Sequence, residues 1–179
     1  MYQTYEHELV FHGDNKSLKM ILKHLSQAVN NLDHEHPLFG AQIEISLKNL
    51  SNQLMTNQTN IFVWGEDCNE AFILDNEQLK FRFQTLNEPL NPNIIYTLVK
   101  AFNCRYAWLY QWDEIISETS DGFDAKVRLT YCDHEQLKTR STIINGAKDY
   151  DHLDQLLKVM KNELRSQFAP PVKKKQSSK

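Results

Sequence analysis

The fold is decided by residues 62–99, which contain Phe62-Val63-Trp64-Gly65, then Leu79-Lys80-Phe81-Arg82-Phe83-Gln84-Thr85, then Pro89 and finally Ile94-Ile95-Tyr96-Thr97-Leu98-Val99. The apolar and polar residues of 79–85 alternate, which is typical of a strand with one packed and one partly wet face. After the turn at Pro89, apolar residues recur at helical spacing. The stretch therefore predicts a Trp-Gly corner, a strand, a turn and a helix.

Outward from this stretch, the same two periodicities predict further elements. Alternation over residues 5–11 predicts a first strand, and an apolar stripe from Leu18 to Leu32 predicts a long helix that Asp14 caps. Residues 33–37 then form a closing turn, because Pro37 cannot continue a helix. Residues 41–57 fit a short strand followed by a helical turn or a loop, and 61–64 should be extended. Residues 71–74 and 79–85 fit a hairpin.

The second half of the chain follows the same logic. Asn91 is the expected cap of the second helix, with Pro92 at its first position. A last helix begins at Asp149 or Asp151 and ends before Pro170. Between these helices the sequence predicts strands at 105–112 and 123–131, an acidic loop at 113–121, and extended structure near 141–144.

This order of elements favours the α+β class. Each helix has one apolar stripe and the clearest strands alternate, which suits an antiparallel or mixed sheet with helices on one face. We expect a ferredoxin-like split β-α-β arrangement with an added C-terminal helix. The predicted organisation is a single domain over residues 1–169, with a core at 5–130 and an extension at 131–169. A disordered basic tail at 170–179 completes it.

Charge is distributed unevenly along the chain. Residues 170–179 carry four lysines and no acid, so the rest has 16 basic against 23 acidic residues, a net charge of −7. A body of that sign favours a basic partner over a phosphate backbone, unless its basic residues cluster on one face. The start of the chain has no apolar signal segment and no run is long enough to span a membrane, so we expect a cytoplasmic protein.

Several short motifs suggest a relationship to a known family. Leu9-Val10-Phe11-His12-Gly13, Trp64-Gly65-Glu66-Asp67-Cys68 and Thr85-Leu86-Asn87-Glu88-Pro89-Leu90 occur in this order, before an aromatic strand and Asp113-Glu114. The chain thereby resembles a ferredoxin-like family of uncharacterised proteins from conjugative plasmids and phages. That family has Trp-Gly-x-x-Trp and Thr-x-Trp-x-Pro-Pro motifs, and Cys68, Asn87 and Leu90 depart from them. The resemblance implies a fold and a mobile-element origin in a bacterial host, and no catalytic residues.

Two neighbouring segments are candidates for partner binding. Five acids lie close together around 113–124, and their spacing does not match a calcium loop. Before them, four aromatic residues alternate along the strand at 105–112, so they share one face. That face is either core, a protein contact or a stacking surface for bases. The candidate partner-binding residues are Asp113, Glu114, Glu118, Asp121, Asp124, Trp108 and Trp112.

No arrangement in the sequence predicts catalysis, a metal or a cofactor. His34 and His36 lack further ligands at a recognised spacing, and a solvated turn explains them more simply. Cys132 and His134 could share a face, but nothing supplies an oxyanion site or an orienting group. The three widely spaced cysteines fit free, buried thiols.

The sequence thus favours a non-enzymatic interaction protein of a phage or plasmid. Its acidic surface would contact a host protein or nucleoprotein complex with a basic surface, such as a nucleic-acid-targeting defence system of the CRISPR or restriction type. One alternative is a single-stranded nucleic-acid-binding module that uses the strand aromatics and the lysine tail. A second alternative is an enzyme of unrecognised type.

Overall fold

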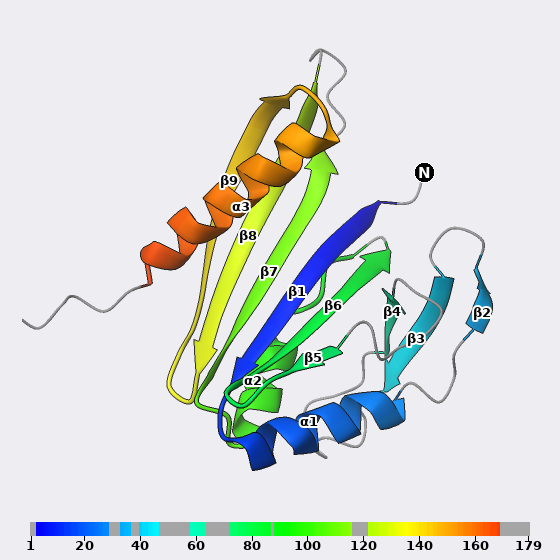
Figure 1. Ribbon diagram of the computed structural model, residues 1–179, viewed down its shortest axis with the longest axis vertical. Coiled ribbons are helices and arrows are strands. Elements are labelled where there is room, and N and C mark those ends of the chain that lie inside the picture. The colour runs from blue at the N-terminus through cyan, green and yellow to red at the C-terminus, as the bar shows by residue number, and fades with distance from the viewer. Residues whose placement is uncertain are drawn as a thin grey trace, which may run out of the picture.

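The computed structural model describes residues 3–28, 33–36, 40–46, 58–63, 72–86, 88–115 and 122–168 (Figure 1). Within these ranges, nine strands form one sheet in the order β2-β3-β4-β6-β1-β7-β8-β9, and β5 also pairs with β6. The elements are β1 (Thr4–His12), α1 (Asn15–Ala28), β2 (Asp33–His36), β3 (Gly40–Ser46), β4 (Gln58–Val63), β5 (Phe72–Leu74), β6 (Gln78–Leu86), α2 (Asn93–Ala101), β7 (Tyr106–Ile115), β8 (Phe123–Asp133), β9 (Leu137–Ala147) and α3 (Tyr150–Ser166).

The first strand lies in the interior of the sheet. β1 pairs antiparallel with β6 on one side and with β7 on the other. β6 and β7 therefore run parallel to each other with β1 between them, and α2 connects them. The predicted α+β class is confirmed, and every strand pairing described is antiparallel. The strand order is not the one expected of a ferredoxin-like fold, so that finer assignment stays a prediction.

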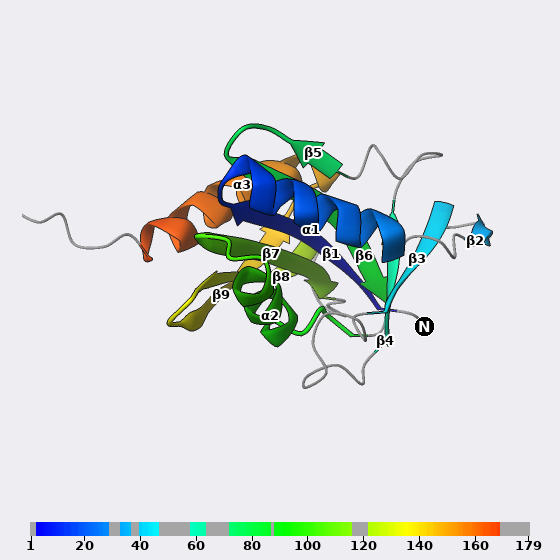
Figure 2. The ribbon, with the colours of Figure 1, turned by 90° about the horizontal axis from the view of Figure 1, so that it is seen from below.

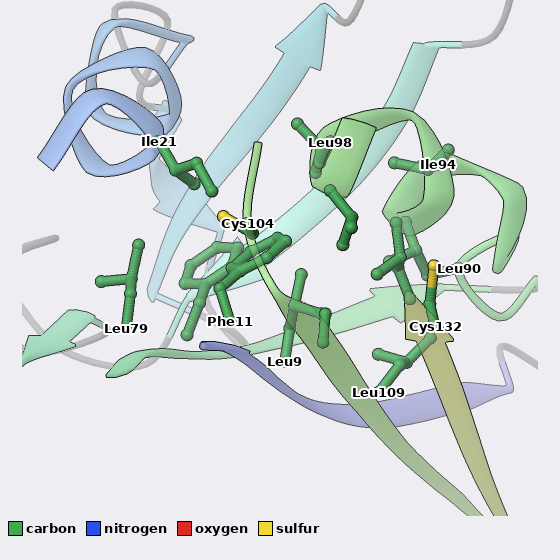
Figure 3. Close-up of a cluster of buried hydrophobic side chains, with 14 of the residues drawn as sticks. Leu9, Phe11, Ile21, Leu79, Leu90, Ile94, Leu98, Cys104, Leu109 and Cys132 are labelled. Carbon is green, nitrogen blue, oxygen red and sulfur yellow. The ribbon is translucent and has the colours of Figure 1, made fainter. Parts of the chain in front are cut away.

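One face of the sheet carries the first hydrophobic cluster. Leu9 and Phe11 of β1 pack there with Phe81 of β6 and with the apolar stripes of α1 and α2. Figure 3 shows Ile21 of α1 and Leu98 of α2 on the same side of β1 as Phe11. Phe11 is completely buried, so this cluster is the centre of the molecule's larger core.

The opposite face carries a second cluster, and α3 covers it. Val127 and Leu129 of β8 pack there against Leu153, Leu157 and Leu164 of α3. Figure 2 shows α2 and α3 on opposite sides of β7 and β8. The prediction of helices on one face is therefore wrong. Apolar residues at alternate positions of β8 give that strand a second packed face, to which the stripe of α3 binds.

Both predicted capping aspartates begin their helices. The Ser17 backbone N–H donates to Asp14 Oδ1 over 2.8 Å, and the His152 backbone N–H donates to Asp149 Oδ1 over 2.7 Å. At α2, however, Pro92 is the cap and not the first helical residue. Asn91 still contributes there, because its side-chain oxygen accepts a hydrogen bond from the Asn93 N–H.

Three segments differ from the sequence prediction or extend it. Residues Asp33–His36 form β2 and not a turn, paired with β3. β7 continues to Ile115, so Asp113 and Glu114 belong to a strand and not to a loop. β9 extends over Leu137–Ala147, well beyond the segment expected near 141–144. The predictions for 47–57, for Trp64-Gly65 and for the tail at 170–179 lie outside the described residues.

None of the helices in the described ranges has both the length and the apolar character required to cross a membrane.

Candidate nucleic-acid interface

The aromatic residues of β7 lie on the face that α3 covers in part. Tyr110 is buried under the helix, and its hydroxyl donates to the backbone oxygen of Leu157 over 3.3 Å. Trp108 is two residues earlier and only half-buried, beside the last turn of α3. The four aromatics predicted to share a face are thus in different environments, because the helix stops before it reaches Tyr106.

An open groove begins where the cover of α3 ends. It encloses about 520 Å³. The Tyr131 ring lies 4.9 Å from the Trp108 ring, and the Phe168 ring meets Trp108 edge-on at 5.4 Å between centroids. Tyr131 also lies 5.9 Å from Tyr106, so rings from β7, from β8 and from just after α3 line one concavity. This outer groove is lined by Tyr106, Trp108, Tyr131, Asn162, Arg165, Ser166 and Phe168.

Two basic side chains lie beside these rings. The Arg165 guanidinium lies 5.1 Å from the centre of the Trp108 ring, a cation–π contact. Lys138 of β9 is paired directly with Tyr131 across the sheet, so the two side chains share a face. Lys138 and Arg165 are both exposed. The outer groove therefore combines flat apolar surfaces with positive charge.

A smaller inner cavity of about 80 Å³ adjoins the outer groove, since Trp108 and Arg165 line both. Three cations, Lys80, Lys161 and Arg165, are among its polar residues. Glu8 is the only acid among them, and it forms ion pairs with Lys161 and with Arg82. Burial alone would raise the pKa of Glu8, but Lys161, Lys80 and Arg82 outweigh burial and lower it. The inner cavity is lined by Glu8, Val10, His12, Gln78, Lys80, Trp108, Tyr110, Leu129, Lys161 and Arg165.

His12 closes one side of the inner cavity. Its ring stacks on Tyr106 with centroids 4.5 Å apart. Burial, reinforced by Arg165 and Arg105, lowers the pKa of His12, so the ring is neutral at pH 7. The buried atoms Nε2 of His12 and Nε1 of Trp108 have no hydrogen-bond partner within the described ranges. Both atoms are covered by their neighbours, so burial leaves them without a hydrogen bond.

The carboxylate nearest to Tyr131 is already occupied. Asp133 accepts hydrogen bonds from the backbone N–H groups of Glu135 and Gln136, each within 2.9 Å, and from the Tyr131 hydroxyl at 3.0 Å. Burial and this bond to Asp133 raise the pKa of Tyr131 to about 12. Asp133 thus holds the turn between β8 and β9, and Tyr131 stays a neutral ring in the groove.

The predicted acidic residues do not form one cluster among the described residues. Asp113 is buried, with its carboxylate 2.9 Å from Arg128 Nη2 and from the Gln3 side-chain nitrogen. Asp124 accepts a hydrogen bond from the Gly146 N–H over 2.7 Å. Glu114 is half-buried near Tyr150, while Glu118 and Asp121 lie outside the described residues. The partner-binding role assigned to these acids stays a prediction.

Cys104, Cys132 and His134 are part of the packed structure and form no catalytic arrangement within the described residues. Burial raises the pKa of the Cys132 thiol to about 12 and that of Cys104 to about 11, so both are poor nucleophiles. A ring nitrogen of His134 hydrogen-bonds the backbone oxygen of Cys104 over 2.7 Å. In the part of the chain that the structure describes, no group of three or more histidine, cysteine or acidic side chains could hold a metal ion.

A scan against protein-family models and searches of curated proteins and of solved structures found no match to this chain. The likeness to plasmid and phage proteins therefore remains an expectation from the sequence motifs.

Sequence reasoning identified Trp108 but missed the residues that α3 adds to it. Arg165 and Phe168 look like an ordinary exposed and an ordinary apolar position of an amphipathic helix. Their contact with Trp108 depends on which face α3 covers and where it ends. Phe168 offered one signal, because it extends the apolar stripe beyond the last helical residue, Ser166.

Proposed function

We propose that this protein binds single-stranded nucleic acid in the outer groove. The observation that carries the proposal is the meeting of four aromatic rings with Arg165 in one open concavity beside the end of α3. Bases of any sequence stack on aromatic side chains, and positive charge along the same groove attracts the backbone. The arrangement favours binding without strong sequence preference and without chemistry on the bound strand.

The charge of the groove supports this proposal despite the acidic body. Lys138 of β9 and Arg165 of α3 lie on the same side of the sheet beside the groove, and neither forms an ion pair within the described ranges. Local field and not net charge decides where a phosphate backbone binds. Lys173, Lys174 and Lys175 follow Phe168 by only a few residues. At about 3.5 Å per residue, a chain of this length can span at most roughly 25 Å.

Fluorescence anisotropy with a labelled oligo-dT and an oligo-U strand at about 50 mM salt tests the proposal, because electrostatic binding is strongest at low salt. Arg165→Gln removes the cation over Trp108 from an exposed position, and Trp108→Ala removes the central ring. We expect each variant to weaken binding by about fivefold or more, because removing the stacking of one base costs about 1–3 kcal/mol.

Trp112→Ala is the matched control, since Trp112 is on the same face of β7 but lines neither cavity. Circular dichroism should show that Arg165→Gln is folded. No binding of either strand at low salt overturns the proposal, and so does equal binding by the Arg165→Gln variant. If Trp112→Ala reduced the affinity for the strand as much as Trp108→Ala does, the strand would not bind in the outer groove, and the proposal would be wrong.

A second candidate function keeps the interaction-protein hypothesis, with a different surface. At the far end of the sheet, Tyr150 is 59% exposed and Ile115 36% exposed, beside Glu114. Apolar residues next to an acid suit a partner whose surface is basic with apolar contacts. We infer that a non-enzymatic role against a host nucleic-acid-targeting complex would use this end of the molecule, outside the groove.

Binding to a purified host nuclease or defence complex, measured by co-purification, tests this second function. The Glu114→Lys and Tyr150→Ala variants should lose the complex, while Arg165→Gln should retain it. If Arg165→Gln alone abolished the association, the groove and not the acidic end would be the contact. If no such complex associated with the wild-type protein, the second function would be wrong.

A further inference from the structure

The inner cavity is smaller than the outer groove, and more cations line it. A water needs at least about 10–15 Å³ of such space, so a cavity of about 80 Å³ admits a group of roughly five heavy atoms. Lys80, Lys161 and Arg165 line it. The single carboxylate there, Glu8, is balanced by its ion pairs with Lys161 and Arg82. A compact anion is the group that these surroundings favour.

The phosphodiesters within a strand and the phosphomonoester at its end differ in charge. A phosphodiester within a strand carries one negative charge. Because it is bonded to a nucleotide on each side, its binding site must be open at both ends. A phosphomonoester at a strand end carries about 1.5–2 charges at pH 7 and has oxygens free on three sides. The cavity matches the second kind, because its three cations and one carboxylate give it a net charge of about +2, which neutralises more than one negative charge.

The cavity is placed to receive such an end. Trp108 and Arg165 line both the inner cavity and the outer groove, so a nucleotide stacked in the groove has its phosphate close to the shared wall. We propose that the inner cavity binds the terminal phosphomonoester of a single strand whose last base stacks in the outer groove. This inference rests on the proposed function.

The test compares three oligo-dT strands of one length with the full-length protein: one with a 5′-phosphate, one with a 3′-phosphate and one with hydroxyls at both ends. Each carries its fluorescent label at the end without phosphate, or within the strand. We expect one of the phosphorylated strands to bind about fivefold or more tightly than the hydroxyl strand, as hydrogen bonds to charged groups are among the stronger ones. The phosphorylated strand that binds more tightly shows whether the 5′ or the 3′ end is recognised.

Lys80→Met should remove this preference and leave binding of the hydroxyl strand nearly unchanged, because Lys80 lines only the inner cavity. Lys138→Met is the matched control, since Lys138 lies beside Tyr131 outside the cavity. This variant should lower the affinity for all three strands by the same factor. Inorganic phosphate in excess should abolish the preference of the wild-type protein.

The outcomes separate the two proposals. If none of the strands binds, the proposed function itself fails. If all three bind with equal affinity, or if Lys80→Met retains the preference for a terminal phosphate, the proposed function stands and the terminal-phosphate site is overturned.

Discussion

At the scale of single residues, His7 is the group whose chemistry the fold changes most. It is 4% exposed, its ring stacks on Phe83 with centroids 4.6 Å apart, and its Nε2 accepts a hydrogen bond from the Leu90 N–H. Burial lowers the pKa of His7 from 6.5 to about 3. The folded protein therefore holds this histidine neutral throughout the range in which the unfolded chain would protonate it.

We predict that the protein loses stability on acidification because of His7. The contribution of a neutral His7 is fully present above the unfolded pKa of 6.5 and is lost as pH falls towards the folded pKa of about 3. Between pH 7.5 and 5.0 the free energy of unfolding should fall by about 2 kcal/mol through this group. Urea titrations at the two pH values measure it.

The His7→Asn variant provides the comparison for that measurement. Asparagine retains an oxygen that can accept the Leu90 N–H bond but cannot be protonated in this range. The variant should be less stable at neutral pH, yet its stability should depend less on pH than that of the wild-type protein. Identical pH dependence in the two proteins would show that His7 is not the responsible group.

At the scale of elements, α3 determines whether the groove exists. It supplies Arg165, and Phe168 lies two residues beyond its last residue, Ser166. The helix is held to the sheet by Leu153, Leu157 and Leu164. The groove is thus a consequence of how a helix is anchored and of where it stops.

We predict that Leu157→Ala lowers the free energy of unfolding by about 2–5 kcal/mol, the usual cost of replacing a buried leucine with alanine. Leu157 is 4% exposed in the second cluster. Val159→Ala on the same helix should cost far less, because Val159 is 48% exposed. Urea denaturation followed by circular dichroism measures both. A similar loss for the two variants would contradict the described docking of α3.

The elements themselves were largely predictable from sequence, because their signals are local. Alternation at Leu79–Thr85 identified β6, and Asp14 and Asp149 marked the starts of their helices. The side on which α3 packs was not predictable, since a one-sided apolar stripe fits either face of a sheet. The groove could be foreseen only as far as Trp108, because Arg165 and Phe168 reach it through that packing.

At the scale of the whole molecule, charge is the property that links the groove to the tail. The body has a net charge of −7 and the last ten residues carry four lysines. Under the proposed function, the tail would add electrostatic attraction next to the groove while the groove supplies stacking. The two contributions differ in how they respond to salt, because only ionic interactions release counterions.

We predict that changing Lys173, Lys174 and Lys175 to glutamine weakens binding of single strands and flattens its dependence on salt. Each lysine–phosphate interaction that the change removes should reduce the slope of log K against log salt by about 0.7. Arg165→Gln should reduce the affinity mainly by removing support for stacking. Anisotropy titrations from about 50 to 200 mM salt measure the slope. A triple-glutamine variant with the wild-type slope would exclude the tail from the interface.

The interior position of β1 has a consequence for the order of folding. β1 leaves the ribosome before either of its neighbours, whose pairing residues are 78–86 on one side and 106–112 on the other. One edge of this strand therefore stays unpaired until residues 78–86 are made and the other until residues 106–112 are made, and closing such distant pairs slows folding. Glu6 and Glu8 put negative charge on the waiting strand, a feature that discourages pairing with the wrong chain. Nascent chains that end before residue 106 should consequently depend on a chaperone to remain unaggregated.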